Sequence, residues 1–173
     1  MESKAKLLGH PIHPMLIVFP LGLLATAAVF DIVGLAKSDS SWFDISYWMI
    51  AAGIIGGLLA AVFGLIDWIA IPSGTRAKRI GLLHGATNVL VTLLFIVSWF
   101  LRGTPVQTAS TGALTCSFLG VVLALVGGWL GGELVDRLGI GVDDGAHANA
   151  PNALSGKPAT ESEPHTTNLR RVA

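Results

Sequence analysis

The chain has 173 residues, of which 52% are hydrophobic and only 13% are charged, and its mean hydropathy is +0.67. A soluble domain carries about 25% charged residues, so this composition argues against an ordinary water-soluble fold and indicates a membrane protein. Eleven basic and eleven acidic residues cancel, which gives no reason to expect a nucleic-acid partner, and a single cysteine excludes internal disulfides and cysteine-rich zinc sites.

Four apolar stretches are long enough to cross a bilayer, which takes about 20 helical residues. They cover residues 15–36, 45–71, 80–101 and 113–135. The links between them are short and contain Gly, Pro, Ser or Asp, which favour turns. We therefore predict an all-α membrane protein in which residues 1–140 form an up-down-up-down bundle of four transmembrane helices in contact with the lipid bilayer.

The first stretch begins with an unusual motif, Gly-His-Pro-Ile-His-Pro at residues 9–14. A residue before proline favours extended backbone, and in a polyproline II helix side chains three residues apart project the same way. The motif therefore predicts that His10 and His13 form a co-facing pair just before Pro14 opens the helix. Pro20 predicts a kink soon afterwards.

Small residues recur at helical spacing in the second and fourth stretches, at Gly53, Gly57, Gly120 and Gly128. Small side chains let helix backbones approach closely, and van der Waals contact then drives their association in lipid. We interpret these glycines as packing positions within the bundle, with the seam of a homodimer as the alternative.

Ionisable side chains within membrane spans are energetically expensive and therefore mark candidate functional sites. The alternating helix directions bring several polar side chains of different stretches to one end of the bundle. These are His10, His13, Asp67, His84 and Glu133, with Asn88 one helical turn beyond His84. Asp31 lies at the opposite end, and we interpret it as an ordinary interfacial residue.

Three functions suit this group of polar side chains. The first is a haem b or transition-metal site with His10, His13, Asp67 and His84 as ligands, because bundle cores take such ligands from neighbouring helices. The second is a small proton-coupled transporter in which Asp67, His84 and Glu133 titrate. The third is a structural subunit of a membrane complex. The sequence carries no catalytic motif, so we favour a role other than that of an enzyme.

The two helical hairpins also echo each other. The first runs from His13 to Asp67 and the second from His84 to Glu133. A parallel two-fold repeat about the membrane normal is one interpretation of this echo.

The opening motif, the segment Gly-Leu-Ile-Asp-Trp at residues 64–68, and His84 with Asn88 resemble a bacterial membrane family catalogued as domain of unknown function 2231. The resemblance extends over about residues 7–138. It implies a bacterial inner-membrane location and motif roles for the four ligand candidates named above. Some relatives are joined to iron–sulfur or other redox domains, which implies an electron-transfer role with a membrane redox partner.

Basic residues concentrate on the cytoplasmic side of membrane proteins. Most of those near the predicted spans lie before the first stretch, between the second and third, and after the fourth. They are Lys4, Lys6, Arg76, Lys78, Arg79 and Arg137. Both termini are therefore expected in the cytoplasm. From residue 141 onward the sequence has almost no large apolar residues, so residues 141–173 are expected to form a disordered cytoplasmic tail.

Overall fold

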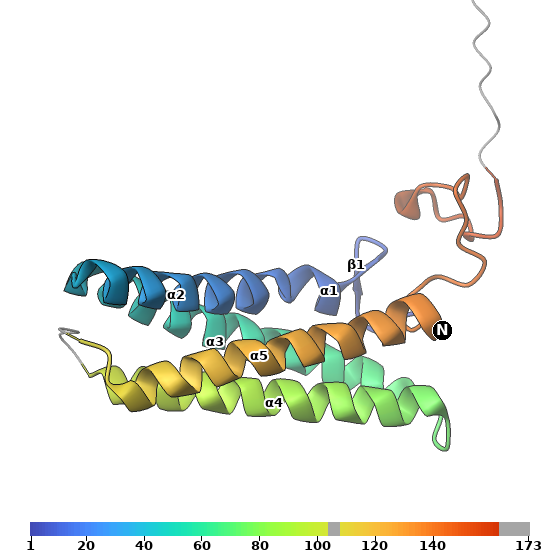
Figure 1. Cartoon of the computed structure of the whole chain (residues 1–173). Coiled ribbons are helices and arrows are strands. Elements are labelled where there is room, and N and C mark those ends of the chain that lie inside the picture. The colour runs from blue at the N-terminus through green and yellow to red at the C-terminus, as the bar shows by residue number, and fades with distance from the viewer. Residues whose placement is uncertain (104–107, 163–173) are drawn as a thin grey trace, which may run out of the picture.

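The computed structural model describes residues 1–103 and 108–162, in which four long helices lie side by side (Figure 1). The helical elements are α1 (Ile12–Leu16), α2 (Val18–Lys37), α3 (Ser40–Ala70), α4 (Arg76–Arg102) and α5 (Thr111–Gly132), which continues into a π-helical turn, η1 (Glu133–Arg137). These elements form four spans that are each long and apolar enough to cross a membrane. The first span is α1 together with α2, the second is α3, the third is α4, and the fourth is α5 together with η1. The predicted four-helix fold is confirmed, and the predicted span ends differ from the helix ends by a few residues.

The first span is interrupted at Ile17, between α1 and α2. Pro20 explains the interruption, because a proline has no backbone N–H to donate to the carbonyl four residues earlier, which here belongs to Leu16. The backbone N–H of Ile17 still donates to the carbonyl oxygen of His13, and the backbone N–H of Leu21 donates to the carbonyl oxygen of Ile17. The backbone of Ile17 stays in the right-handed helical region, so the kink predicted from Pro20 remains a prediction.

The chain enters the first span through a short antiparallel strand pair, not through a polyproline segment. β1 (Lys6–Leu7) pairs with β2 (His10–Pro11), and α1 begins immediately afterwards at Ile12. His13 is therefore inside a helix while His10 is on an exposed strand, and the predicted co-facing pair is wrong. The prediction failed because proline is tolerated in the first turn of a helix, so Pro14 did not delay its start.

Each helix packs on the next one along the chain, and α2 also packs on α5. Consecutive helices are antiparallel, so α2 and α4 run parallel and face each other diagonally across the bundle (Figure 1). The N-terminal segment, the link between α3 and α4, and η1 lie at one end of the bundle, which we call the histidine end. The link between α2 and α3 lies at the other end, which we call the far end.

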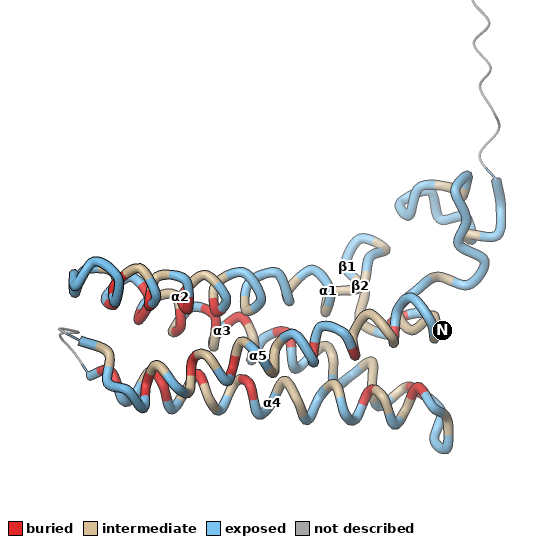
Figure 2. The backbone as a smooth tube through the Cα atoms, viewed as in Figure 1, coloured by how far each residue is buried: buried red, intermediate tan, exposed pale blue. Residues whose placement is uncertain are grey.

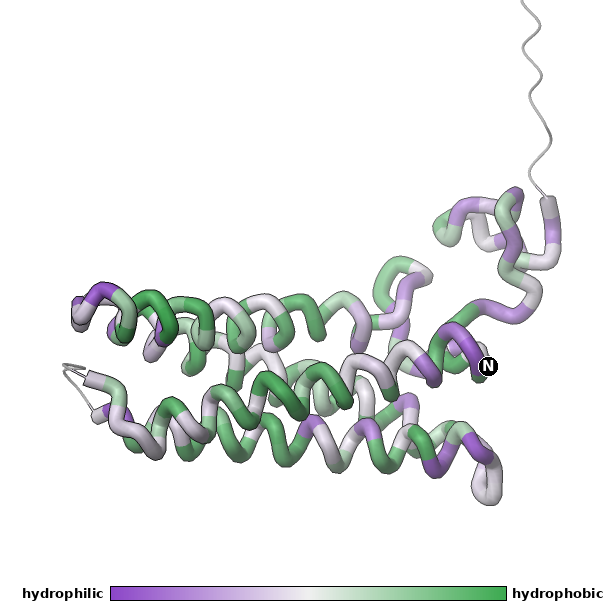
Figure 3. Tube along the Cα trace, in the orientation of Figure 1, coloured by the Kyte–Doolittle hydropathy of each residue, from purple (hydrophilic) through white to green (hydrophobic). Residues whose placement is uncertain are grey.

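The buried residues line the inside of the bundle (Figure 2). Leu24, Ala27, Ile50, Val91 and Phe95 form its central cluster, in which Ile50 and Phe95 are completely buried. Many large apolar side chains of the spans are exposed, and hydrophobic residues predominate along the traces of the helices (Figure 3). Apolar side chains facing outward are what a lipid-covered surface requires, since a soluble bundle would place polar groups there.

The predicted packing glycines differ in their surroundings. A Cβ atom at Gly53 would lie 2.5 Å from Leu24, and one at Gly120 would lie 2.7 Å from the Phe95 ring. A Cβ atom at Gly57 would lie 3.6 Å from the Cβ of Pro20 on α2, which is an ordinary contact distance. Gly128 is exposed, and a Cβ there would meet nothing within 4 Å, so it makes no helix contact within the described part of the chain.

The first part of the predicted tail, residues 141–162, touches the N-terminal segment. The backbone N–H of Gly141 donates to the carbonyl of Met1 over 2.9 Å, and the Lys6 ammonium binds the Asp143 carboxylate. A 3-10 turn, η2 (Ala153–Ser155), lies against Gly9. The rest of the predicted tail, residues 163–173, lies outside the described residues.

Candidate functional site

Two histidines from diagonal helices meet at the histidine end. His13 on α1 and His84 on α4 have ring centroids 6.2 Å apart and ring planes at 85°. His13 Nδ1 lies 2.8 Å from the carbonyl oxygen of Ala60 on α3, and His84 Nδ1 lies 2.9 Å from the carbonyl oxygen of Gly127 on α5. Each imidazole is therefore fixed by the next membrane span along the chain, His13 by α3 and His84 by α5.

These contacts determine the tautomer of both rings. A carbonyl oxygen only accepts a hydrogen bond, so both Nδ1 atoms must carry the proton. In a neutral imidazole with a protonated Nδ1, the Nε2 atom keeps a lone pair that can bind a proton or a metal ion. Metal-binding histidines in proteins are oriented in this way, through a hydrogen bond from the second ring nitrogen to a carbonyl or carboxylate.

Glycines make the space that the two rings occupy. A Cβ atom at Gly64 on α3 would lie 2.9 Å from the Cε1 and Nδ1 atoms of His13. A Cβ atom at Gly131 on α5 would lie 3.2 Å from Cε1 of His84. Any larger residue at Gly64 would displace the His13 ring, and one at Gly131 would push the His84 ring aside by a few tenths of an ångström.

Asn88 supports His84 from the next turn of α4. Its side-chain amide donates to the His84 carbonyl over 2.8 Å and lies 3.4 Å from both ring nitrogens. Thr92 continues this stripe by donating to the Asn88 carbonyl over 2.8 Å. A polar stripe thus leads from His84 two turns into the span, where polar groups are otherwise scarce.

The other residues predicted as ligands or as acidic members of the site do not join the histidine pair. Both Asp67 carboxylate oxygens accept hydrogen bonds from the Ser3 hydroxyl, at 2.9 and 2.8 Å, and Oδ1 also accepts the Lys4 N–H at 2.7 Å. Glu133 accepts from the Arg76 guanidinium over 2.5 Å. His10 is exposed on β2. Within residues 1–103 and 108–162, no three His, Cys, Asp or Glu side chains are grouped as metal ligands, so the predicted four-ligand set is not assembled.

Asp67 has a structural role that the sequence did not suggest. By binding Ser3 and Lys4, its carboxylate ties the N-terminal segment to the end of α3. Nearby, the Trp68 indole N–H donates to the Lys78 carbonyl over 3.1 Å, while the Lys78 ammonium donates to the Trp68 carbonyl and lies 4.0 Å from the indole centroid. These contacts close the link between α3 and α4 at the histidine end.

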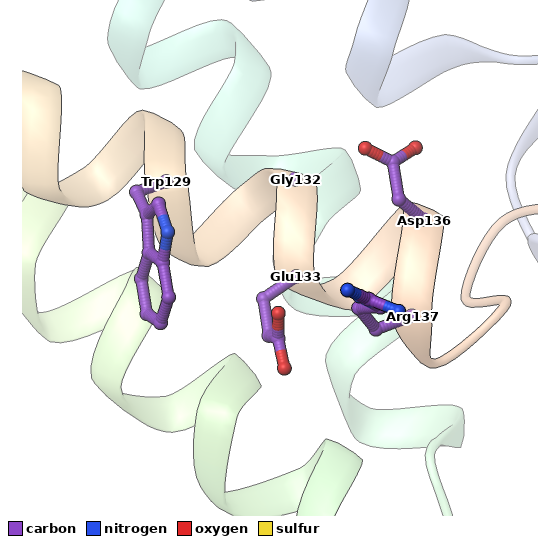
Figure 4. A pocket seen from close by; sticks show the side chains of 5 residues that line it. All are labelled: Trp129, Gly132, Glu133, Asp136 and Arg137. Carbon is purple, nitrogen blue, oxygen red and sulfur yellow. The ribbon is translucent and has the colours of Figure 1, made fainter.

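A shallow pocket of about 200 Å³ lies on η1 at the same end. Its lining residues are Trp129, Gly132, Glu133, Asp136 and Arg137 (Figure 4). The Asp136 carboxylate points away from the Glu133 carboxylate, so the two acids do not converge (Figure 4). Neither histidine lines this pocket, and we treat it as separate from the histidine pair.

The comparison with known families decides the classification. The family described as "Predicted membrane protein (DUF2231)" matches residues 9–144, which include all four spans and both histidines of the pair. The chain belongs to the DUF2231 family. The resemblance inferred from the opening motif is confirmed, and the chain is a multi-pass membrane protein with four candidate spans. No curated protein and no solved structure matches this DUF2231 chain.

The far end of the bundle contains an ion pair that sequence reasoning missed. Arg102 on α4 donates to both carboxylate oxygens of Asp31 on α2, over 2.7 and 2.6 Å, and both side chains are completely buried. The Ser117 hydroxyl lies 3.1 Å from the same guanidinium and shares a 2.8 Å hydrogen bond with Ser98. The interpretation of Asp31 as an interfacial residue is therefore wrong.

A signal for this pair was present in the sequence. Asp31 follows His13 by 18 residues, and Arg102 follows His84 by the same number. Because α2 and α4 are parallel, equal spacing from a facing pair places the second pair face to face as well. Opposite charges at such positions predict an ion pair across the bundle.

Proposed function

We propose that this protein is a membrane subunit that holds one transition-metal centre, haem iron or a copper ion, between His13 and His84. The observation that carries the proposal is that two diagonal helices present imidazoles whose Nδ1 atoms are both bound to backbone carbonyls. That arrangement leaves one lone pair on each Nε2, and the Asn88 amide lies 3.4 Å from the Nε2 atom of His84. It also holds both rings against rotation before any ion binds, which lowers the entropic cost of binding.

The ring separation fits a single ion. A metal–nitrogen bond is about 2.0 Å, and the ring centre lies about 1.1 Å behind the nitrogen, so two imidazoles on opposite sides of an ion have centroids about 6.2 Å apart. The centroids of His13 and His84 are 6.2 Å apart. This centroid spacing suits one ion between two rings whose Nε2 atoms face each other, whereas a haem also requires its porphyrin ring to enter from the side.

Haem iron and copper both change charge by a single electron and are bound by imidazole, which connects this site to a redox role. His13 and His84 would hold such an ion, which would supply one-electron exchange between a reduced and an oxidised membrane partner. The expected partner is another membrane redox protein, or a second copy of this chain, at the histidine end.

A second candidate function is proton-coupled transport, and the polar stripe on α4 favours it. His84, Asn88 and Thr92 lie one turn apart on the same face of α4. The Asn88 side chain donates to the backbone carbonyl of His84, and the Thr92 hydroxyl donates to the backbone carbonyl of Asn88. The relay first predicted from Asp67 and Glu133 loses both carboxylates, because Asp67 binds the N-terminal segment and Glu133 binds an arginine. A transporter of this kind therefore has to carry protons through the stripe alone.

Absorption spectroscopy and elemental analysis of the purified protein test these functions. We expect about one iron or copper per chain, with a Soret band if the iron is in haem. His84→Ala is expected to remove most of the metal, since loss of a ligand lowers metal affinity by about 10- to 100-fold or more. His10→Ala is the matched control, because His10 is an exposed histidine outside the spans.

The outcomes separate the candidates. Wild-type protein that is colourless and free of metal, from cells supplied with iron and copper, refutes the metal proposal. Transport of protons by vesicles of wild-type protein, lost in His84→Ala, then supports the second candidate. Loss of thermal stability in His84→Ala without either effect identifies a purely structural histidine, with an expected cost of about 1–3 kcal/mol for the stranded carbonyl partner.

We also propose that both termini and the histidine end face the cytoplasm of a bacterial inner membrane. Burial of Arg102 in an ion pair strengthens the charge asymmetry, since it leaves Lys37 as the basic residue beside the link between α2 and α3. In a Cys116→Ser background, an impermeant thiol reagent added to intact cells should label Ser40→Cys and not Ser73→Cys. The reverse pattern of labelling refutes this orientation.

A further inference from the structure

The same three contacts occur in both helical hairpins. An imidazole binds a backbone carbonyl, as His13 with Ala60 and His84 with Gly127. The same imidazole packs on a glycine that lies one helical turn after the residue with the bound carbonyl. This glycine is Gly64 for His13 and Gly131 for His84. A large apolar side chain, 11 residues after the histidine, packs on another glycine, as Leu24 on Gly53 and Phe95 on Gly120.

One pair of offsets relates all these positions. For equivalent positions of the two hairpins, the residue numbers differ by 71 in the first helix of the hairpin and by 67 in the second. The offset of 71 relates His13 to His84, Leu24 to Phe95 and Asp31 to Arg102. The offset of 67 relates the acceptor and glycine positions of α3 to those of α5. Under these offsets Asp67 matches Leu134 and not Glu133, so the echo read from the sequence holds for the histidines and fails for the acids.

The contacts between the hairpins join equivalent positions. His13 meets His84 at the histidine end, Leu24 and Phe95 share the central cluster, and Asp31 binds Arg102 at the far end. Residues related by a two-fold rotation meet each other only on the rotation axis. Direct meetings at both ends, with a shared cluster between them, define an axis that runs along the bundle, as in parallel repeats related about the membrane normal.

We infer that α1–α3 and α4–η1 are two copies of one hairpin related by a pseudo-two-fold axis, and that His13 and His84 are equivalent ligands on opposite sides of one ion on this axis. The second part rests on the function proposed above and specifies its geometry. Equivalent imidazoles facing each other across an axis suit two-coordinate Cu(I) or the two axial positions of haem iron. They do not suit tetrahedral Zn²⁺, which needs two further ligands.

The first test compares the two histidines in the full-length protein. His13→Ala and His84→Ala are titrated with chelator-buffered Cu(I) and with haemin, alongside wild type and His10→Ala. Equivalent ligands predict that both variants lose affinity for the same probe by about 10- to 100-fold and within about threefold of each other, with His10→Ala unchanged. A loss confined to one histidine overturns the shared site, and so does a second ion bound per chain.

The second test needs no metal and examines the repeat itself. Leu24→Phe and Phe95→Leu exchange the two equivalent side chains that pack on Gly53 and Gly120. If the hairpins are equivalent, the double variant recovers most of the melting temperature in detergent that each single variant loses. A double variant that melts no higher than the worse single variant overturns the repeat. Wild-type protein that binds neither probe, together with rescue by the double variant, rejects the metal centre and retains the repeat.

Discussion

Replacing Asp31 with asparagine keeps the shape of the side chain but removes the negative charge that faces Arg102. Both side chains are completely buried, and the guanidinium donates two charge-assisted hydrogen bonds to the carboxylate. After the substitution, Ser117 at 3.1 Å and Ser98 at 3.4 Å remain as neutral acceptors. Arg102 then keeps its charge in an apolar bundle without a counter-ion.

The expected cost of Asp31→Asn is about 3–5 kcal/mol, because removal of one partner from a buried ion pair leaves an uncompensated buried charge. The double substitution Asp31→Leu with Arg102→Met removes both charges together and fills similar volume. Buried pairs replaced in this way are neutral or more stable by about 1–4 kcal/mol. The double variant is therefore expected to be far more stable than Asp31→Asn.

Reversible unfolding in mixed detergent micelles measures both free energies, and Arg102→Met alone completes the double-mutant cycle. Size-exclusion chromatography checks that each variant starts as the same folded species. A cost below about 1 kcal/mol for Asp31→Asn would show that water reaches the pair, since only a solvated ion pair is so weak. A double variant as unstable as the single one would equally refute the reasoning.

Two further predictions concern other parts of the chain. Gly120→Ala should lower the free energy of unfolding by about 1–3 kcal/mol, because its Cβ would lie 2.7 Å from the buried Phe95 ring, while the exposed Gly128→Ala should change it by less than about 0.5 kcal/mol. Lys6→Ala should release residues 141–162 to proteolysis without lowering the melting temperature of the helices. The bound Asp143 carboxylate raises the pKa of Lys6, so in wild type the lysine keeps its charge at neutral pH and the contact is lost as the pH rises through that raised value.

The four spans were predictable because long apolar runs and polar turn-forming links are local properties of the sequence. The meeting of His13 and His84 was also predictable, since alternating helix directions place the starts of the first and third spans at one end. Neither the ring orientation nor the carbonyl partners could be read in the same way. They depend on the register of α3 against α1 and of α5 against α4, which composition does not specify.

The failures have a common cause, which is that polar residues were assigned from their depth in the membrane and not from their partners. Asp67 lies at the expected end but binds Ser3 and Lys4, which are more than sixty residues away in sequence. Asp31 lies near a helix end, where water normally reaches a carboxylate, yet Arg102 and two serines enclose it. Only the packing of α2 and α4 on α5 determines that outcome.

The ion pair also constrains how the protein is made. Asp31 enters the membrane with the first span, but Arg102 is synthesised 71 residues later, at the end of the third. Until then the Asp31 carboxylate of the first hairpin has no counter-ion. Because an unpaired charge is costly inside a bilayer, this carboxylate stays at the polar boundary of the membrane. Burial of Asp31 in the bundle therefore depends on the arrival of the third span, which supplies Arg102.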